Sequence, residues 1–148
     1  MGLIHIDLFT TLDGVAQAPG GPNEDPDGGF AFGGWQAPLI DEVVGEQINS
    51  GMAGMDALLL GRRTYDIFAA YWPHAGGDIA RLFNRLPKYV ASRQKPALEW
   101  AGSTLLGPDV VAAVRELRDR HANIHVIGSL DFVPVSYTHL TLPTILLV

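Results

Sequence analysis

Short apolar runs alternate along this chain with segments of helical periodicity, and this alternation limits the folds that the chain can adopt. The run "DALLLG" (56–61) is apolar almost throughout, as in a strand that is buried on both faces. Further strands are predicted at 3–10, 86–92, 103–107 and 124–129, and helices at 38–53, 64–71 and 108–121. Strands connected through helices favour an α/β fold with a largely parallel central sheet.

The segment that precedes the first buried strand combines a long loop with a helix. Residues 19–34 ("PGGPNEDPDGGFAFGG") are rich in glycine, proline and acidic residues, and loops of this length are often lids or binding loops. In the helix at 38–53, Pro38 suits the first turn, and Asp41 with Glu42 suits the positive end of the helix dipole.

Composition excludes several classes of protein. The 148 residues suit one domain, and the absence of cysteine excludes disulfides, thiolate nucleophiles and cysteine-bound metals. A formal net charge of −6 argues against general nucleic-acid binding, which needs a basic face. No signal peptide or membrane-spanning run is recognisable, so we expect a cytoplasmic protein without membrane contact. The five histidines show no metal-ligand spacing, and we expect no metal.

Polar and glycine residues follow the buried strands. In a parallel sheet the carboxyl ends of all strands lie at one edge, where ligands bind. The residues expected at this edge are Gly61-Arg62-Arg63-Thr64, Ser92-Arg93-Gln94, Gly107 and Gly128-Ser129.

These residue types suit an anion. Free N–H groups at a helix start attract negative charge, glycine permits close approach, and arginine offers a planar pair of donors for phosphate oxygens. Arginines follow two different strands, so one group can hold a pyrophosphate and the other the 2′-phosphate of NADP. This arrangement favours NADPH over NADH. The alternative is that these arginines are solvated surface residues.

Together, the motifs "FTTLDGVAQAPGG", "LLLGRRTYDIFAAYWP", "YVASRQ", "STLLGPDVVAAVRELR" and "HVIGS" resemble the dihydrofolate reductase-like fold. In particular, they are similar to the family of the C-terminal reductase domain of the riboflavin-biosynthesis deaminase–reductase, over roughly residues 3–130. The resemblance implies a three-layer α/β sandwich with a mostly parallel central sheet. It also implies a stand-alone, homodimeric, NADPH-dependent reductase of a pteridine- or pyrimidine-like heterocycle, with 5-amino-6-(5-phosphoribosylamino)uracil reductase as one such activity.

The resemblance also implies roles for particular residues. Gly61 and the three residues after it, Arg62, Arg63 and Thr64, would face the cofactor phosphates. Ser92 and Arg93 would lie at the 2′-phosphate, and Gly128 and Ser129 would lie at the pyrophosphate. The loop before Trp35 would cover nicotinamide and substrate. Asp13 and Asp41 are the candidate catalytic carboxylates, although one extra residue separates Trp35 from Asp41 relative to dihydrofolate reductase.

Each candidate carboxylate also has a structural explanation. Asp13 precedes Gly14 and could simply form a turn, and Asp41 could only compensate the helix dipole. Asp7 shares a strand face with His5, either as a polar pocket wall or as an edge position, and His5 and His125 are expected to be hydrogen-bonded strand residues. A nucleotide-binding or interaction domain of the same fold, without hydride chemistry, remains an alternative function.

The end of the chain departs from the family pattern. From about residue 134 the sequence "PVSYTHLTLPTILLV" has no helical period, and "VSYTHL" is similar to one reading frame of a transposon-end adapter. We therefore expect an incomplete reductase-like domain at 1–133 and a non-native tail at 134–148, with C-terminal strands missing or replaced. The alternative is a genuine C-terminus in which "LTLPTILLV" forms a last strand.

Overall fold

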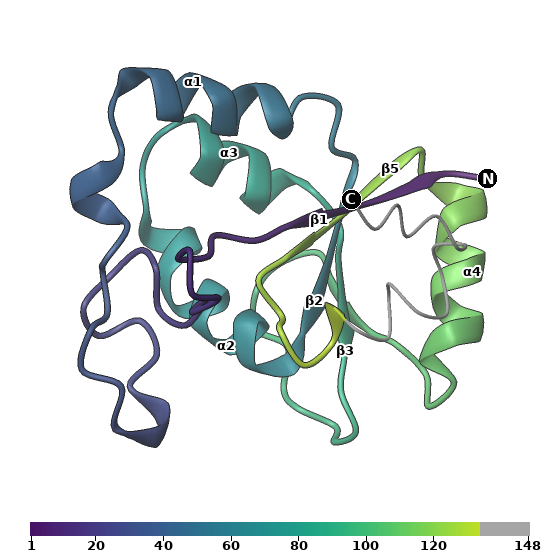
Figure 1. Ribbon diagram of the computed structural model, residues 1–148. Coiled ribbons are helices and arrows are strands. Elements are labelled where there is room, and N and C mark those ends of the chain that lie inside the picture. Colours follow the sequence, from purple (N-terminus) through teal and green to yellow (C-terminus); the bar gives the residue numbers. More distant parts are fainter. Residues whose placement is uncertain (134–148) are drawn as a thin grey trace. The chain divides into compact units, whose positions relative to one another are not determined.

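The computed structural model describes residues 1–133 and contains a sheet of five parallel strands (Figure 1). The strands are β1 (Leu3–Asp7), β2 (Ala57–Gly61), β3 (Lys88–Ala91), β4 (Ser103–Leu105) and β5 (Asn123–Ile127). Their order across the sheet is β1-β5-β2-β3-β4, and every pair of neighbours is parallel. The prediction of an α/β fold with a parallel sheet is therefore confirmed for the described residues.

Helices connect the strands or precede them. The α-helices are α1 (Glu42–Gly51), α2 (Arg62–Tyr71), α3 (Asp78–Arg85) and α4 (Val110–Arg120), and the 3-10 helices are η1 (Asp27–Gly29), η2 (Ala37–Leu39) and η3 (Trp72–His74). Helix α3 was not predicted, although Ala80 and Phe83 are buried at helical spacing.

Helix α4 packs against one face of the sheet. Its buried residues Val114 and Leu117 lie in one hydrophobic cluster with residues that alternate along the strands, namely Ala57, Leu59, Tyr89, Ile124 and Val126. Ile4 and Ile6 of β1 pack against the same cluster. Period-two burial of this kind is what a pleated strand requires, because successive side chains point to opposite faces.

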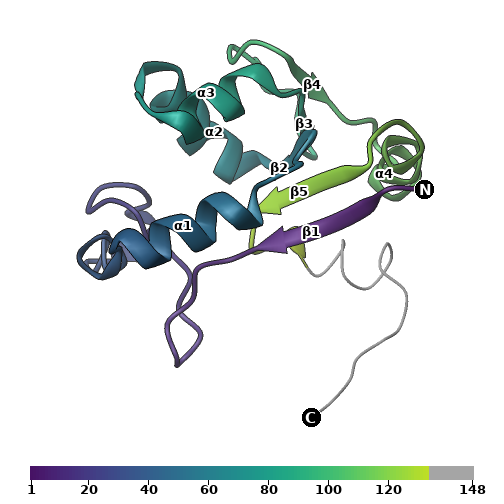
Figure 2. The same ribbon diagram turned by 90° about the horizontal axis from the view of Figure 1, so that it is seen from above.

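The opposite face of the sheet is met by α2 and α3 (Figure 2). Lys88, which pairs in register with Leu58, extends from this face and donates to the carbonyl oxygen of Asn84 in α3 (3.0 Å). Tyr65 of α2 accepts a hydrogen bond from the backbone N–H of Trp100 (3.1 Å). Helices on both faces make three layers, as a doubly covered parallel sheet requires.

The chain divides into two compact units, which we describe separately. The first contains Met1–Asp7 and the chain from Met55 onward, and therefore holds all five strands. The second is Leu8–Gly54 and contains α1, η1 and η2.

Several predicted boundaries are wrong by a few residues. Pro38 does not lie in the first turn of α1 but in η2, because α1 begins at Glu42 with Asp41 as its N-cap. Helix α2 begins at Arg62 rather than at residue 64, directly after the strand. Strand β1 ends at Asp7 and β5 at Ile127, so Gly128 and Ser129 follow the strand instead of closing it.

No helix within residues 1–133 is long and apolar enough to cross a membrane. The suspected non-native tail at 134–148 lies outside the described residues, as does any final strand formed by "LTLPTILLV".

Candidate functional site

The polar residues predicted at the carboxyl edge of the sheet do share one edge. Gly61 pairs with Ala91 in register, and Asp7 pairs with Ile127, so β1, β2, β3 and β5 end at the same level. The segments that follow these strands are therefore neighbours, which is where ligands bind in parallel α/β sheets.

Hydrogen bonds join the segment after β2 to the segment after β5. The N–H of Gly61 donates to Oγ of Ser129 (2.9 Å), and the N–H of Ser129 donates to Oγ1 of Thr64 (2.9 Å). Gly128 and Ser129 both have positive φ, of 60° and 56°. A Cβ on Gly128 would lie 3.3 Å from Oγ1 of Thr64, so the turn needs glycine both for its conformation and for its close approach to α2.

The segment after β3 is joined to the start of α2 by a hydrogen bond of Arg62. Its guanidinium donates to Oε1 of Gln94 (2.9 Å) and to Oδ2 of Asp66 (2.8 Å), and the N–H of Gln94 donates to Oγ of Ser92 (3.0 Å). Arg63 and Arg93 are exposed. The structure thus brings together three of the four predicted segments by direct contacts.

The amino end of α2 lies at this edge and differs from those of α1 and α4. Asp41 and Asp109 cap α1 and α4 by accepting hydrogen bonds from first-turn amides (2.8 and 2.9 Å). The N-cap of α2 is Gly61, which has no side chain to serve its amides, and the first turn carries Arg62 and Arg63. The N–H groups at a helix start, together with positive side chains, favour an anion.

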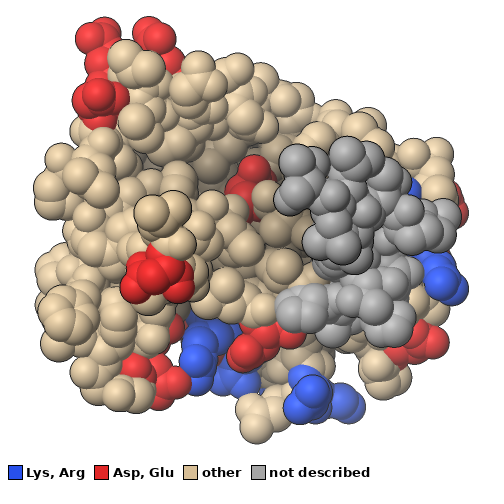
Figure 3. Space-filling view, viewed as in Figure 1, with Lys and Arg blue, Asp and Glu red and all other residues tan. Residues whose placement is uncertain are grey.

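The surface of the protein carries charges of both signs. On the face seen in Figure 3, blue Lys and Arg side chains lie at the lower margin with red Asp and Glu side chains among them. The mixture of signs on this face agrees with a formal net charge of −6.

The remaining predicted residues, Asp13, Trp35 and Asp41, belong to the Leu8–Gly54 unit and make local contacts there. Asp13 accepts a hydrogen bond from the hydroxyl of Thr11 (2.6 Å), which lowers the pKa of this exposed carboxyl below its ordinary value of 3.8. The indole N–H of Trp35 donates to the carbonyl oxygen of Gln17 (2.9 Å). Asp41 is the N-cap of α1. Gly107, expected after β4, has no neighbour within 4 Å of its would-be Cβ.

One acidic residue at the carboxyl edge was not among the predicted site residues. Asp7 is the last residue of β1, and its Oδ2 lies 2.7 Å from Nδ1 of His125 in β5. His5 stacks on His125 with ring centroids 4.4 Å apart and also contacts Oδ1 of Asn123 (3.2 Å). The expectation that both histidines are hydrogen-bonded strand residues is confirmed. The face shared by His5 and Asp7 was visible in the sequence, whereas their pairing with β5 depended on the sheet order.

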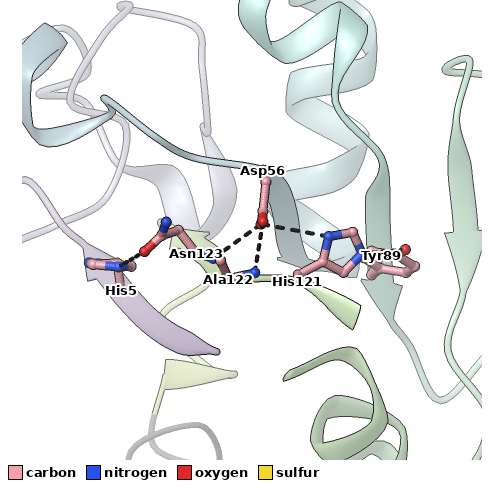
Figure 4. A network of polar contacts seen from close by, with 6 residues as sticks. All are labelled: His5, Asp56, Tyr89, His121, Ala122 and Asn123. Carbon is pink, nitrogen blue, oxygen red and sulfur yellow. Dashed lines mark hydrogen bonds and ion pairs between the residues drawn. The ribbon is translucent and has the colours of Figure 1, made fainter. Parts of the chain in front are cut away.

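A second polar network lies at the opposite, amino edge of the sheet (Figure 4). Asp56 accepts hydrogen bonds from the N–H groups of Ala122 (2.7 Å) and Asn123 (3.2 Å), and its Oδ1 lies 3.6 Å from Nδ1 of His121. His121 in turn contacts the hydroxyl of Tyr89 (2.9 Å). Because Asp56 serves backbone amides at the α4–β5 junction, this network has a structural explanation.

No protein-family model and no curated protein sequence matches this chain. Residues 1–133 also contain no group of three or more acidic or histidine side chains placed to hold a metal ion.

Proposed function

We propose that the protein is an NADPH-dependent reductase of a pteridine- or pyrimidine-like heterocycle. The observation that carries the proposal is the amino end of α2 at the carboxyl edge of the sheet, where Gly61 and Thr64 are hydrogen-bonded to Ser129 and the first turn carries two arginines. The resemblance of the sequence motifs to riboflavin-biosynthesis reductases supplies the reaction type and the substrate class. As part of the same proposal, the protein acts in the cytoplasm as a homodimer.

The residues at this edge fit a dinucleotide with an additional phosphate. The first-turn amides of α2, with Arg62 and Arg63, would hold the pyrophosphate together with the backbone of Gly128. Ser92 and the exposed Arg93 would hold the 2′-phosphate. Bound NADPH supplies a hydride, and the chain supplies position and exclusion of water.

Cofactor binding tests this proposal most directly. Titration with NADPH, followed by quenching of tryptophan fluorescence, should show saturable binding, and NADH should bind more weakly. Arg93→Ala should weaken NADPH binding by about tenfold, since it removes one charge-assisted contact, and leave NADH binding unchanged.

Arg115→Ala, which changes an exposed arginine of α4, is the matched control for the loss of one positive charge. The proposal is wrong if folded protein binds neither nucleotide, or if both arginine variants weaken NADPH equally. Oxidation of NADPH in the presence of oxidised and partly reduced pteridines and of 5-amino-6-(5-phosphoribosylamino)uracil would then identify the substrate.

A nucleotide-binding domain without hydride chemistry is the second candidate. It is favoured by the local contacts of Asp13 and Asp41, because each carboxylate already serves a hydrogen bond within its own segment. In that case NADPH would bind, but no heterocycle would cause its oxidation.

A further inference from the structure

We infer that Asp7, held by His125, is the proton donor of the reductase proposed above. This inference depends on that function and adds a residue to it. Reduction of a C=N bond requires a hydride at carbon and a proton at nitrogen, and the proton must come from the protein or from water. Asp13 is hydrogen-bonded within its own turn to Thr11 and belongs to the Leu8–Gly54 unit, whereas Asp7 lies in the unit that holds the sheet.

The position of Asp7 meets the first requirement. As the last residue of β1 it lies at the carboxyl edge, and the N–H of Gly128 donates to its carbonyl oxygen (3.1 Å). The next residue, Ser129, donates a hydrogen bond to Thr64 of α2. Asp7 is therefore adjacent to the turn that takes part in the candidate cofactor site, and all these residues belong to the same compact unit.

The contacts of Asp7 meet the second requirement. Asp41, Asp56 and Asp109 each accept hydrogen bonds from backbone amides, which explains them structurally. Within residues 1–133 the carboxylate of Asp7 has one hydrogen-bond partner, the imidazole of His125. That contact uses Oδ2 and leaves Oδ1 available, and the side chain is 34% exposed.

His125 is a positioning residue. Its side chain is 2% exposed, so it cannot itself meet a substrate. The stacked ring of His5, held by Asn123, fixes the plane of the imidazole, and Nδ1 then fixes Asp7. A polar pair with a buried histidine is a weak source of stability compared with apolar residues of the same size, which favours a functional explanation here.

The proposed step balances without a further reactant. The Nδ1–H of His125 donates to Oδ2 of Asp7, and the transferable proton lies on Oδ1. If bound NADPH supplied a hydride to the substrate carbon, the Oδ1–H bond of Asp7 would break and an N–H bond would form on the substrate. The Asp7 carboxylate then recovers a proton from water.

Substitution of Asp7 tests the inference in the full chain. Asp7→Asn keeps the size and the acceptor for His125, and should lower kcat by about 100-fold while the NADPH dissociation constant changes less than about twofold. Asp7→Ala should be similarly slow, and added formate should restore its turnover because formate replaces the missing carboxyl group. His125→Gln should lower kcat by about tenfold with unchanged NADPH binding. Asp119→Asn, an exposed carboxylate of α4, is the matched control and should change nothing.

Nuclear magnetic resonance supplies a readout that does not require turnover. The Nδ1–H proton of His125 should be observed downfield in the wild type and in Asp119→Asn, and should move upfield in Asp7→Asn. Absence of this signal from the folded wild type would contradict the pairing and overturn the inference.

The kinetic outcomes separate the two proposals. If the wild type reduces a heterocycle and Asp7→Asn does so equally well, this inference is overturned and the proposed function stands. If the wild type binds NADPH but reduces none of the heterocycles, or does not bind NADPH, the proposed function is overturned and the inference with it.

Discussion

Lys88 shows how a single residue can lower stability in a pH-dependent manner. Its side chain has no exposed surface, and burial lowers the pKa of its ammonium group from 10.5 to about 8. The charge is nevertheless accommodated, because Nζ donates to the carbonyl oxygens of Asn84 (3.0 Å) and Ala101 (2.9 Å) and lies 4.4 Å from the ring centroid of Trp100. A base whose pKa is lowered by folding binds its proton more tightly in the unfolded chain.

We therefore predict that the free energy of unfolding rises as the pH increases through the range in which only the folded form has lost this proton. The cost of burying the charge is fully present below pH 8 and disappears between pH 8 and 10.5, the folded and ordinary pKa values. Between pH 7.5 and 10 the wild type should gain about 2 kcal/mol relative to Lys88→Met. Urea unfolding followed by circular dichroism measures this gain, with Lys95→Met as an exposed control. Parallel pH profiles for the wild type and Lys88→Met would show that the charge is not penalised.

At the scale of elements, Asp56 connects the start of β2 to the junction between α4 and β5 (Figure 4). Both of its oxygens accept backbone N–H groups, so Asp56→Asn would direct an amide N–H₂ toward one of these donors. We predict that this variant loses about 1 kcal/mol of the free energy of unfolding, the contribution of one hydrogen bond, because the carboxylate is 39% exposed. Urea unfolding measures the loss, and Asp131→Asn, an exposed position, is the control. A loss in Asp56→Asn no larger than in the control would mean that water replaces the carboxylate at this junction.

Asp41 can be explained either as the N-cap of α1 or as a residue that contacts the substrate. As a cap it accepts a hydrogen bond from the N–H of Val44 (2.8 Å), which serine can also do. We predict that Asp41→Ser retains stability and NADPH-dependent turnover, whereas Asp41→Ala loses about 1 kcal/mol of stability. Thermal unfolding and the turnover assay check both variants. A serine variant that is stable but inactive would assign Asp41 to the substrate.

The elements that the sequence predicted are those with strong local signals. The run at Ala57–Gly61 was recognisable because four consecutive apolar residues are buried on both faces. Helix α3 was missed, and α2 was started two residues late, because glycines and arginines at helix starts give weak local signals. The stop of β5 at Ile127 depends on the positive φ of Gly128, which a strand pattern does not reveal.

At the scale of the whole molecule, topology decided how much of the candidate site was predictable. The rule that parallel strands share a carboxyl edge was sufficient to group Gly61–Thr64 with Gly128–Ser129, and the hydrogen bonds between them agree. The rule could not show that β1 lies beside β5, since residues 3 and 123 are paired only through the strand order. The Asp7–His125 contact therefore had no local signal in the sequence, in contrast to the arginines after β2.

The two compact units should also differ in local stability. Within Leu8–Gly54 only Ala18 (4% exposed) and Gln36 (8% exposed) are buried, and α1 buries none of its residues. In β2, by contrast, Ala57, Leu58, Leu59 and Leu60 have no exposed surface. Segments with little apolar burial open without global unfolding, so their amides lose protection first.

We predict that amide hydrogens of α1 exchange at least about 100-fold faster than those of β2 and β5, because no residue of α1 is fully buried and little apolar burial opposes its opening. Hydrogen exchange measured by mass spectrometry on the intact chain tests this, with α4 as a helical control whose Val114 and Leu117 are fully buried. If the amides of α1 are protected to the same degree as those of β2, then the exposed side chains of Val43 in α1 and Leu39 just before it must be covered in solution. Exchange at two protein concentrations then decides whether the cover is a second copy of the chain, because only that protection increases with concentration.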